Sequence, residues 1–167
     1  PICDPQAVQR LWKLRPTDVV SAEIGNRIPL AQQGITKKPI RLTGVVRAKS
    51  DGEFTVSGPI YTGAKVSLGR TVVFDTLDAL IVICERRMEP YDIGIFKCVG
   101  MDPSRYDYLL LKSRMYARPV FGAIAKGLIE CDADQGGPTS SNYALFPFKN
   151  IRRPVYPLDQ EIDFHCS

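Results

Sequence analysis

Two runs rich in β-branched residues, 69–75 and 79–84, restrict the fold of this chain more than any other feature of its sequence. The short turn Asp75-Thr76-Leu77-Asp78 separates them, and two strands joined by so short a turn form an antiparallel hairpin. The second run is the most apolar of the chain and ends at the charged residues Glu85-Arg86-Arg87. A membrane span needs about 20 apolar residues. This short run is therefore predicted to be a buried strand of a sheet.

Further strands are predicted on the N-terminal side of this hairpin. Residues 18–24 alternate partly, and residues 40–46 more clearly, between apolar and polar side chains, as half-buried strands do. Ser50-Asp51-Gly52-Glu53 has the composition of a turn, and it leads to a short strand at 54–56. These patterns predict that the N-terminal half is rich in β-structure.

Helices are expected at the beginning of the chain and in its second half. Asp4 followed by Pro5 is typical of a capped helix start, and the helix that begins there is expected to end at Arg15-Pro16. Residues 108–113, 116–125 and 128–132 predict strand, helix and strand, a βαβ unit with a parallel strand pair. We therefore predict a single α+β domain over residues 1–167. It has a mixed β-sheet, a β-rich N-terminal half and a βαβ unit in the C-terminal half.

The composition is that of an ordinary globular chain and argues against several functional classes. Apolar residues make up 44% and charged residues 24% of the 167 residues. The net charge is only +4, and the basic doublets Lys37-Lys38, Arg86-Arg87 and Arg152-Arg153 are scattered along the chain. We therefore expect neither nucleic acid nor a membrane as a partner. Because the chain begins at Pro1 without a leader, we expect a processed chain or a piece of something longer.

The cysteines and the single histidine form no metal motif in the sequence. The five cysteines have no CxxC spacing, and their number is odd. Cys84 and Cys131 lie in apolar runs, which predicts buried thiols in a reducing compartment, the cytoplasm. The one histidine, His165, stands near the C-terminus, so no zinc site is expected within this chain.

Residues 112–116 are the first candidate site, because they would stand where a buried strand ends and a helix begins. Ligands bind at such strand ends, and the free N–H groups of a helix start favour anions. Ser113, Arg114 and Tyr116 are therefore candidates for binding a carboxylate or polarising a carbonyl group. In the alternative interpretation, Ser113 merely caps the helix.

Residues 85–92 form a second candidate, also at the end of an apolar strand. Arg86 and Arg87 are candidates for holding a substrate anion, although such a run is more often a solvated loop paired with its own acids. The sequence contains no nucleophile–base pair and no nucleotide-binding loop. The residues alone therefore do not indicate an enzyme.

In their order along the chain, these stretches resemble the C-terminal domain of the microcystinase C (MlrC)-type metallopeptidases. The resemblance begins at Asp4-Pro5 and extends over nearly the whole sequence. The stretches that carry it are Asp51-Gly52-Glu53-Phe54, Arg86-Arg87-Met88-Glu89-Pro90-Tyr91-Asp92, Gly100-Met101-Asp102-Pro103, Leu110-Leu111-Lys112-Ser113-Arg114, Ile129-Glu130-Cys131-Asp132 and Arg152-Arg153-Pro154-Val155-Tyr156-Pro157-Leu158-Asp159.

The resemblance implies that this chain is one part of a hydrolase. In the family, the zinc ligands belong to a larger N-terminal domain, so zinc is expected there and no cofactor is expected in this chain. The C-terminal domain would pack against the catalytic domain and shape the cleft for small or cyclic peptide substrates. Residues from Ser113 to Arg118 would face the peptide, and the isolated chain would be inactive.

Two adjacent positions depart from the family pattern after Lys112-Ser113-Arg114. After Lys-Ser-Arg the family usually continues with histidine and phenylalanine, whereas Tyr116 and Ala117 stand here. A tyrosine donates hydrogen bonds but is no base at neutral pH, so activity or substrate preference is expected to differ. The alternative function is a free-standing ligand- or protein-binding module without catalysis. Both functions are compatible with a homo-oligomer.

Overall fold

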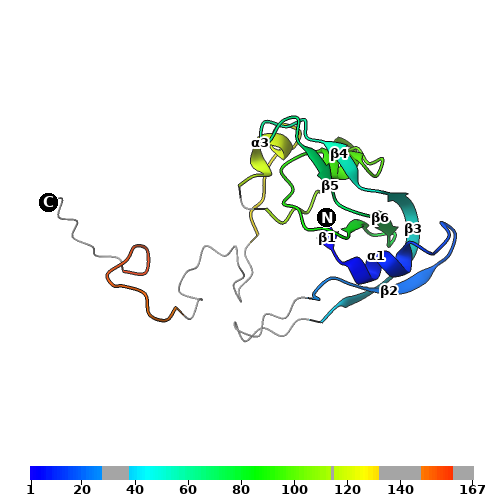
Figure 1. Cartoon of the computed structure of the whole chain (residues 1–167), viewed down its shortest axis with the longest axis horizontal. Helices are drawn as coiled ribbons and strands as arrows, with labels where there is room; N and C mark the ends of the chain where they lie inside the picture. The colour runs from blue at the N-terminus through cyan, green and yellow to red at the C-terminus, as the bar shows by residue number, and fades with distance from the viewer. Residues whose placement is uncertain (28–37, 114, 132–147, 160–167) are drawn as a thin grey trace. The chain divides into compact units, whose positions relative to one another are not determined.

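The computed structural model describes residues 1–27, 38–113, 115–131 and 148–159 (Figure 1). These residues belong to two compact units: the described residues up to Leu128 form the first, and the described residues from Ile129 onward belong to the second. In the second unit, the Arg153 guanidinium pairs with the Asp159 carboxylate, and the Asp159 N–H donates to the Val155 carbonyl at 3.0 Å. The interpretation of residues 1–167 as one domain stays a prediction.

A five-stranded sheet forms the centre of the first unit, with the strand order β1-β7-β6-β3-β2. Its strands are β1 Ile2–Cys3, β2 Val20–Ile24, β3 Ile40–Ser50, β6 Thr71–Asp75 and β7 Leu80–Cys84. The predicted hairpin is confirmed, because β6 and β7 pair in antiparallel register with Val73 opposite Val82. Only β1 runs parallel to its neighbour, β7, so the sheet is mixed. The predicted α+β class is therefore confirmed.

Strand β3 belongs to two strand pairs in succession. Its first residues pair with β2, ending at Gly44 opposite Val20, and its later residues pair with β6, with Val45 opposite Asp75. A register shift between Val46 and Ala48 bends the strand. Beyond this bend the chain forms a second, two-stranded sheet of β4 Glu53–Thr55 and β5 Lys65–Ser67.

Helix α1, Pro5–Leu11, begins where the sequence predicts, and its cap also fastens the chain to the sheet. The Asp4 side chain is completely buried, and its Oδ1 accepts a hydrogen bond from the Ala7 N–H at 3.0 Å. Its Oδ2 accepts from the Gly25 N–H at 2.8 Å and from Arg27 Nε at 3.1 Å. One buried carboxylate thus caps α1 and holds the end of β2.

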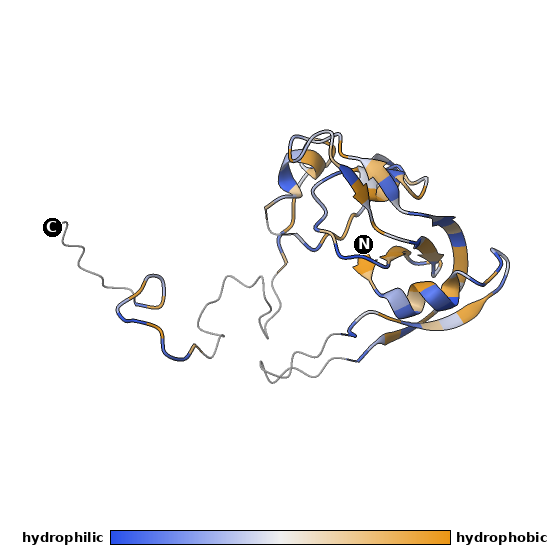
Figure 2. Ribbon diagram, in the orientation of Figure 1, coloured by the Kyte–Doolittle hydropathy of each residue, from blue (hydrophilic) through white to orange (hydrophobic). Residues whose placement is uncertain are grey.

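The sheet is buried on both faces because neighbouring residues of β6 and β7 point to opposite sides. Val72, Phe74 and Ile83 face α1, whose Val8 and Leu11 complete one core. Val73, Val82 and Cys84 face a second core. Figure 2 shows that α1 carries both hydrophobic and hydrophilic residues, as a helix covering one face of a sheet does.

Short helices cover the second face of the sheet. They are α2 Gly94–Lys97, a 3₁₀ helix η2 at Pro103–Arg105, and α3 Arg118–Phe121. Phe96 of α2 and Phe121 of α3 meet edge to face, with ring centroids 5.9 Å apart. In Figure 1, β4, β5 and α3 lie together at one end of this unit, and α1 and β2 lie at the other. None of the helices in the described residues is long and apolar enough to span a bilayer.

The predicted βαβ unit is wrong. The described residues of 108–113 and 128–132 form no strand, and the expected helix over 116–125 is reduced to α3. The apolar pattern correctly reports that Leu109 and Leu111 pack against the second core. It does not show whether a neighbouring strand is present to form backbone hydrogen bonds with this segment. The described residues contain no such strand.

The two cysteines predicted to be buried have opposite environments. Cys84 is 1% exposed, as predicted, whereas Cys131 is exposed. Burial, reinforced by the neighbouring Cys3, raises the pKa of the Cys84 thiol to about 11. At pH 8 only about 0.1% of such a thiol is ionised, and the thiolate is the reactive form.

We therefore expect iodoacetamide at pH 8 to alkylate Cys131 and to leave Cys84 unmodified in the folded chain. Peptide mass spectrometry after a short reaction measures both sites in one sample. Denaturation in urea is the control, since it should bring the two thiols to similar rates. Equal rates in the folded chain would contradict the burial of β7.

Candidate functional site

Three segments of the first unit converge beside the second core: residues 57–63, residues 85–92 and the described residues of 113–118. We call them the loop cluster. The carboxylate of Asp92, which is completely buried, joins the first two segments. Its Oδ2 accepts from the backbone N–H of Ser57 at 3.0 Å and of Gly58 at 2.6 Å. Its Oδ1 accepts from the Gly94 N–H at 2.6 Å, at the beginning of α2. Three backbone donors thus balance one buried negative charge.

Ser113 joins the third segment to the second. Its hydroxyl donates to Glu89 Oε1 at 2.5 Å and accepts from the Ala117 N–H at 3.1 Å, directly before α3. The capping role that the alternative interpretation gave to Ser113 is not observed, because Ala117 is the N-cap residue of α3 and no side chain caps this helix. A role of Ser113 in binding a ligand stays a prediction.

Gly58 brings the first segment against α3. A Cβ atom on Gly58 would lie 2.7 Å from Cγ2 of Val120 and 3.0 Å from Oδ2 of Asp92. No side chain fits between these groups without displacing one of them. The loop cluster is therefore held at three places, by Asp92, by Ser113 and by this close approach.

The start of the 85–92 segment is held by an ion pair. Arg70 donates to Glu85 through Nε at 2.8 Å and through Nη2 at 2.6 Å, and its backbone N–H donates to the same carboxylate at 2.9 Å. The hydrogen bond from Arg70 is the main reason that the pKa of Glu85 is lowered. The Arg70 guanidinium also lies over the ring of Trp12, 5.8 Å from its centroid.

The predicted site residues have different surroundings. Arg86 and Arg87 are exposed, and neither guanidinium forms an ion pair with another described residue. The predicted pairing of this run with its own acids is not observed among the described residues, since Glu85 pairs instead with Arg70, directly before β6. Tyr116 is 47% exposed, and Arg118 is exposed at the start of α3. Arg114 lies outside the described residues.

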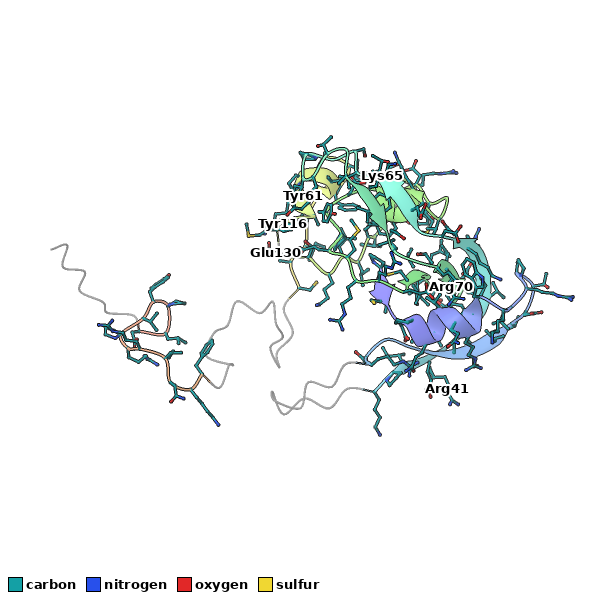
Figure 3. All side chains as sticks on the ribbon, in the orientation of Figure 1. Arg41, Tyr61, Lys65, Arg70, Tyr116 and Glu130 are labelled. Carbon is teal, nitrogen blue, oxygen red and sulfur yellow. The ribbon has the colours of Figure 1, made fainter. Side chains whose placement is uncertain are left out.

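Two tyrosines belong to this end of the unit although the sequence did not single them out. The rings of Tyr61 and Tyr91 meet edge to face, with centroids 5.5 Å apart. Burial is the main cause of the raised pKa of Tyr91, followed by the proximity of Tyr61 and Asp92. Figure 3 shows Tyr61 and Tyr116 on the same side of the unit. The sequence signal that could have indicated this loop is an aromatic residue, Tyr61, between the turn-forming residues Gly58-Pro59 and Gly63.

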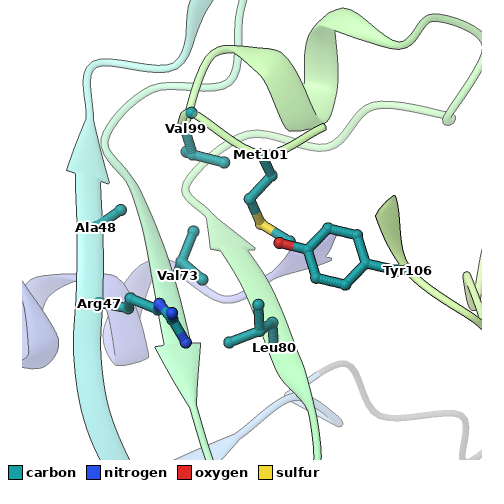
Figure 4. Close-up of a pocket in the computed structure, with 8 residues that line it drawn as sticks. Arg47, Ala48, Val73, Leu80, Val99, Met101 and Tyr106 are labelled. Atoms are coloured by element: carbon teal, nitrogen blue, oxygen red, sulfur yellow. The ribbon is translucent and has the colours of Figure 1, made fainter. Parts of the chain in front are cut away.

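A cavity of about 230 Å³ lies elsewhere, between the second face of the sheet and the segment that follows α2 (Figure 4). It shares no residue with the loop cluster. Its lining residues are Arg47, Ala48, Val73, Leu80, Val99, Gly100, Met101 and Tyr106. Arg47 stands at the bend of β3, and its guanidinium pairs with Asp75 at 2.7 Å.

The described residues do not fit a metal centre, because no three of their histidine, cysteine, aspartate or glutamate side chains gather closely enough to hold an ion. The single histidine, His165, lies outside the described residues. No chemical step through a metal is therefore derived from this chain.

Comparison with known proteins identifies the family. Residues 1–150 match the family described as the MlrC C-terminus. The chain belongs to this family. It is 25% identical over 159 residues to Microcystinase C from a Sphingomonas species, a match that covers 95% of this chain and 29% of that protein.

A solved structure from Mesorhizobium sp. BNC1, described as that of a metallopeptidase, has the same fold as this chain. The two superpose with a TM-score of 0.78 at 22% identity, over 99% of this chain and 31% of that one. The likeness shows a shared fold. This chain spans less than one third of the length of either relative.

The contact between Ser113 and Glu89 gives a test of how this MlrC C-terminal domain holds its loop cluster. We expect Ser113→Ala to lower the free energy of unfolding by about 1 kcal/mol, because the Ala117 N–H and the Glu89 carboxylate lose their shared partner. Urea denaturation measures this loss. Ser104→Ala is the matched control, since its hydroxyl also binds a carboxylate, that of Asp102, but joins no distant segment. An equal loss in both variants would contradict the joining role.

Proposed function

We propose that this chain is the C-terminal, non-metal-binding domain of a zinc-dependent metallopeptidase. In this proposal it packs against an N-terminal catalytic domain, and its loop cluster forms part of the cleft for small or cyclic peptides. The family match and the relatives named Microcystinase C and metallopeptidase support the enzyme class. This chain covers less than one third of each relative, which leaves room for a separate catalytic domain. In this proposal, the zinc site lies in that domain, which precedes this one.

The observation that carries the proposal is the way the loop cluster is built. A buried carboxylate, Asp92, fixes two loops through three backbone N–H groups, and Ser113 fixes the third. Such bonding is costly to leave incomplete and gives rigid loops. Rigid loops that carry exposed arginine and tyrosine side chains are suited to positioning a substrate, because an effective site must hold its ligand within narrow limits.

The exposed side chains define what these loops offer a peptide. The guanidinium groups of Arg86 and Arg87 match carboxylates and peptide carbonyl groups as charged hydrogen-bond donors. The Tyr116 hydroxyl is a neutral donor for an oxygen atom that gains negative charge. The metal in the catalytic domain would supply the activated water. The residues of this chain would bind and orient the peptide.

The first experiment separates this proposal from a free-standing binding module. The whole chain and the catalytic part of its parent polypeptide are purified separately, and metal content and peptide hydrolysis are measured for each and for the mixture. We expect zinc only in the catalytic part, and hydrolysis only or mainly in the mixture. Equal hydrolysis without this chain would contradict its role in the cleft. Failure of the two parts to associate would favour the binding module.

The second experiment tests the site residues. We expect Arg86→Gln to lower kcat/KM for peptide hydrolysis about tenfold, mostly through KM, because one charged hydrogen bond to the substrate is lost. Arg41→Gln is the matched control, since Arg41 is an exposed arginine of β3 outside the loop cluster (Figure 3). The same change in both variants would contradict the assignment of Arg86 to the cleft.

A further inference from the structure

The segment Asp107–Lys112 has the side-chain pattern of a strand, but the described residues place no strand beside it. Leu109 and Leu111 pack against the second core, whereas Tyr108 is 81% and Leu110 is 92% exposed. Burial that alternates with a period of two indicates an extended chain with one face on the domain and one face outward. Tyr106, which leads into the segment, already has the extended angles φ −112° and ψ 143°.

The backbone groups of this segment also lack hydrogen-bond partners among the described residues. Other described turns and loops of the first unit form backbone hydrogen bonds, and the last before this segment runs from the Tyr106 N–H to the Pro103 carbonyl. Between Asp107 and Lys112, no backbone N–H or carbonyl group bonds with another described residue. A row of unpaired N–H and carbonyl groups on an extended segment is a template for an added strand.

We propose that Tyr108–Lys112 is the docking strand of this domain, and that a β-strand from the remaining part of the metallopeptidase polypeptide pairs with it. This inference rests on the proposed function and names the partner surface. The added strand would form hydrogen bonds with the unpaired backbone groups. The part of the polypeptide that supplies this strand would also cover Tyr108 and Leu110. Recognition by strand addition combines main-chain hydrogen bonds with pockets for alternate side chains.

The occupant follows from the amount of polypeptide outside this chain. The match covers only 29% of Microcystinase C and 31% of the Mesorhizobium protein, so more than two thirds of each relative lies outside it. One face of the segment is already buried in its own domain. A partner present in the same polypeptide covers the other face without depending on concentration.

Hydrogen–deuterium exchange tests the pairing directly. In the whole 167-residue chain alone, the amides of 108–112 are expected to exchange within seconds, because no described residue accepts a hydrogen bond from them. In the assembly with the catalytic part of the parent polypeptide, they are expected to exchange at least about 100-fold more slowly, as ladder amides do. Amides that stay fast in the assembly would overturn the proposal. Protection that grows with the concentration of this chain alone would overturn it too, since a second copy would then be the occupant.

Leu110→Asp tests the outward face. The variant is expected to keep the thermal stability of the isolated chain, because Leu110 is exposed there, and to weaken association about 10- to 100-fold, as loss of one buried leucine would. Leu77→Asp is the matched control, since Leu77 is 95% exposed in the turn between β6 and β7. Equal binding of the two variants in an active assembly would overturn the docking strand and leave the proposed function standing. No association of the unmodified chain would overturn both.

Discussion

Replacing Asp92 with alanine is expected to lower the free energy of unfolding by about 3–5 kcal/mol. The carboxylate is completely buried and accepts from the backbone N–H groups of Ser57, Gly58 and Gly94. Alanine leaves all three without a partner, and each buried donor left unpaired costs about 1–3 kcal/mol. The energies do not add fully, because the loops relax toward water.

Urea denaturation followed by circular dichroism measures this loss, with Asp102→Ala as the matched control. Asp102 also accepts from one backbone N–H and from one hydroxyl, both of Ser104, but on the surface, so its loss is expected to cost much less than that of Asp92. If the Asp92 variant loses no more than the control, the loop cluster does not depend on the buried carboxylate.

The Asp92 variant also connects stability with the proposed function. If the loops position a peptide, an Asp92→Ala protein that is still folded should lose kcat/KM in the assembly with the catalytic part. A folded Asp92 variant should keep the edge-to-face contact between Phe96 and Phe121 in the second core. Near-ultraviolet circular dichroism reports that packing. Unchanged hydrolysis with disturbed loops would argue against their place in the cleft.

Gly44→Ala is expected to destabilise the sheet strongly, because the added methyl group has no room there. A Cβ atom on Gly44 would lie 2.1 Å from the backbone oxygen and 2.9 Å from the backbone carbon of Asp75. Gly44 stands where β3 passes from β2 to β6, so relief requires the strands themselves to separate. We expect a loss of about 3 kcal/mol or failure to fold, since overpacking against backbone has no flexible side chain to absorb it.

Thermal denaturation measures the effect, and Gly127→Ala is its control. No atom lies within 4 Å of a Cβ built on Gly127, so this variant is expected to change the free energy of unfolding by about 0.5 kcal/mol or less. A Gly44 variant as stable as the Gly127 variant would show that β3 and β6 are not held as closely as described.

The local elements of this chain were largely predictable from sequence. Asp4 caps α1, the two β-branched runs form the hairpin of β6 and β7, and residues 40–46 lie in β3. In each case the signal is local, because capping chemistry and turn length act over a few residues. The family was also predictable, from the order of short motifs, and the match over residues 1–150 confirms it.

The candidate site was predictable in part. The sequence singled out Ser113, Arg86 and Arg87, and the structure joins their segments through Glu89, which the sequence treated only as one member of a charged run. Asp92 was likewise read as part of a loop, although it is the buried centre of the cluster. Partners 24 and 35 positions apart leave no periodic trace in a single sequence.

The features with local causes follow from the amino-acid sequence: the capped first helix, the hairpin, the mixed α+β class and the family. Which polar groups meet is visible only in the tertiary structure, as is the lack of a strand beside Tyr108–Lys112 among the described residues. The physical reason is that apolar alternation records the burial of side chains. A strand also needs a second backbone to bond with, and the sequence of a segment does not contain its neighbour.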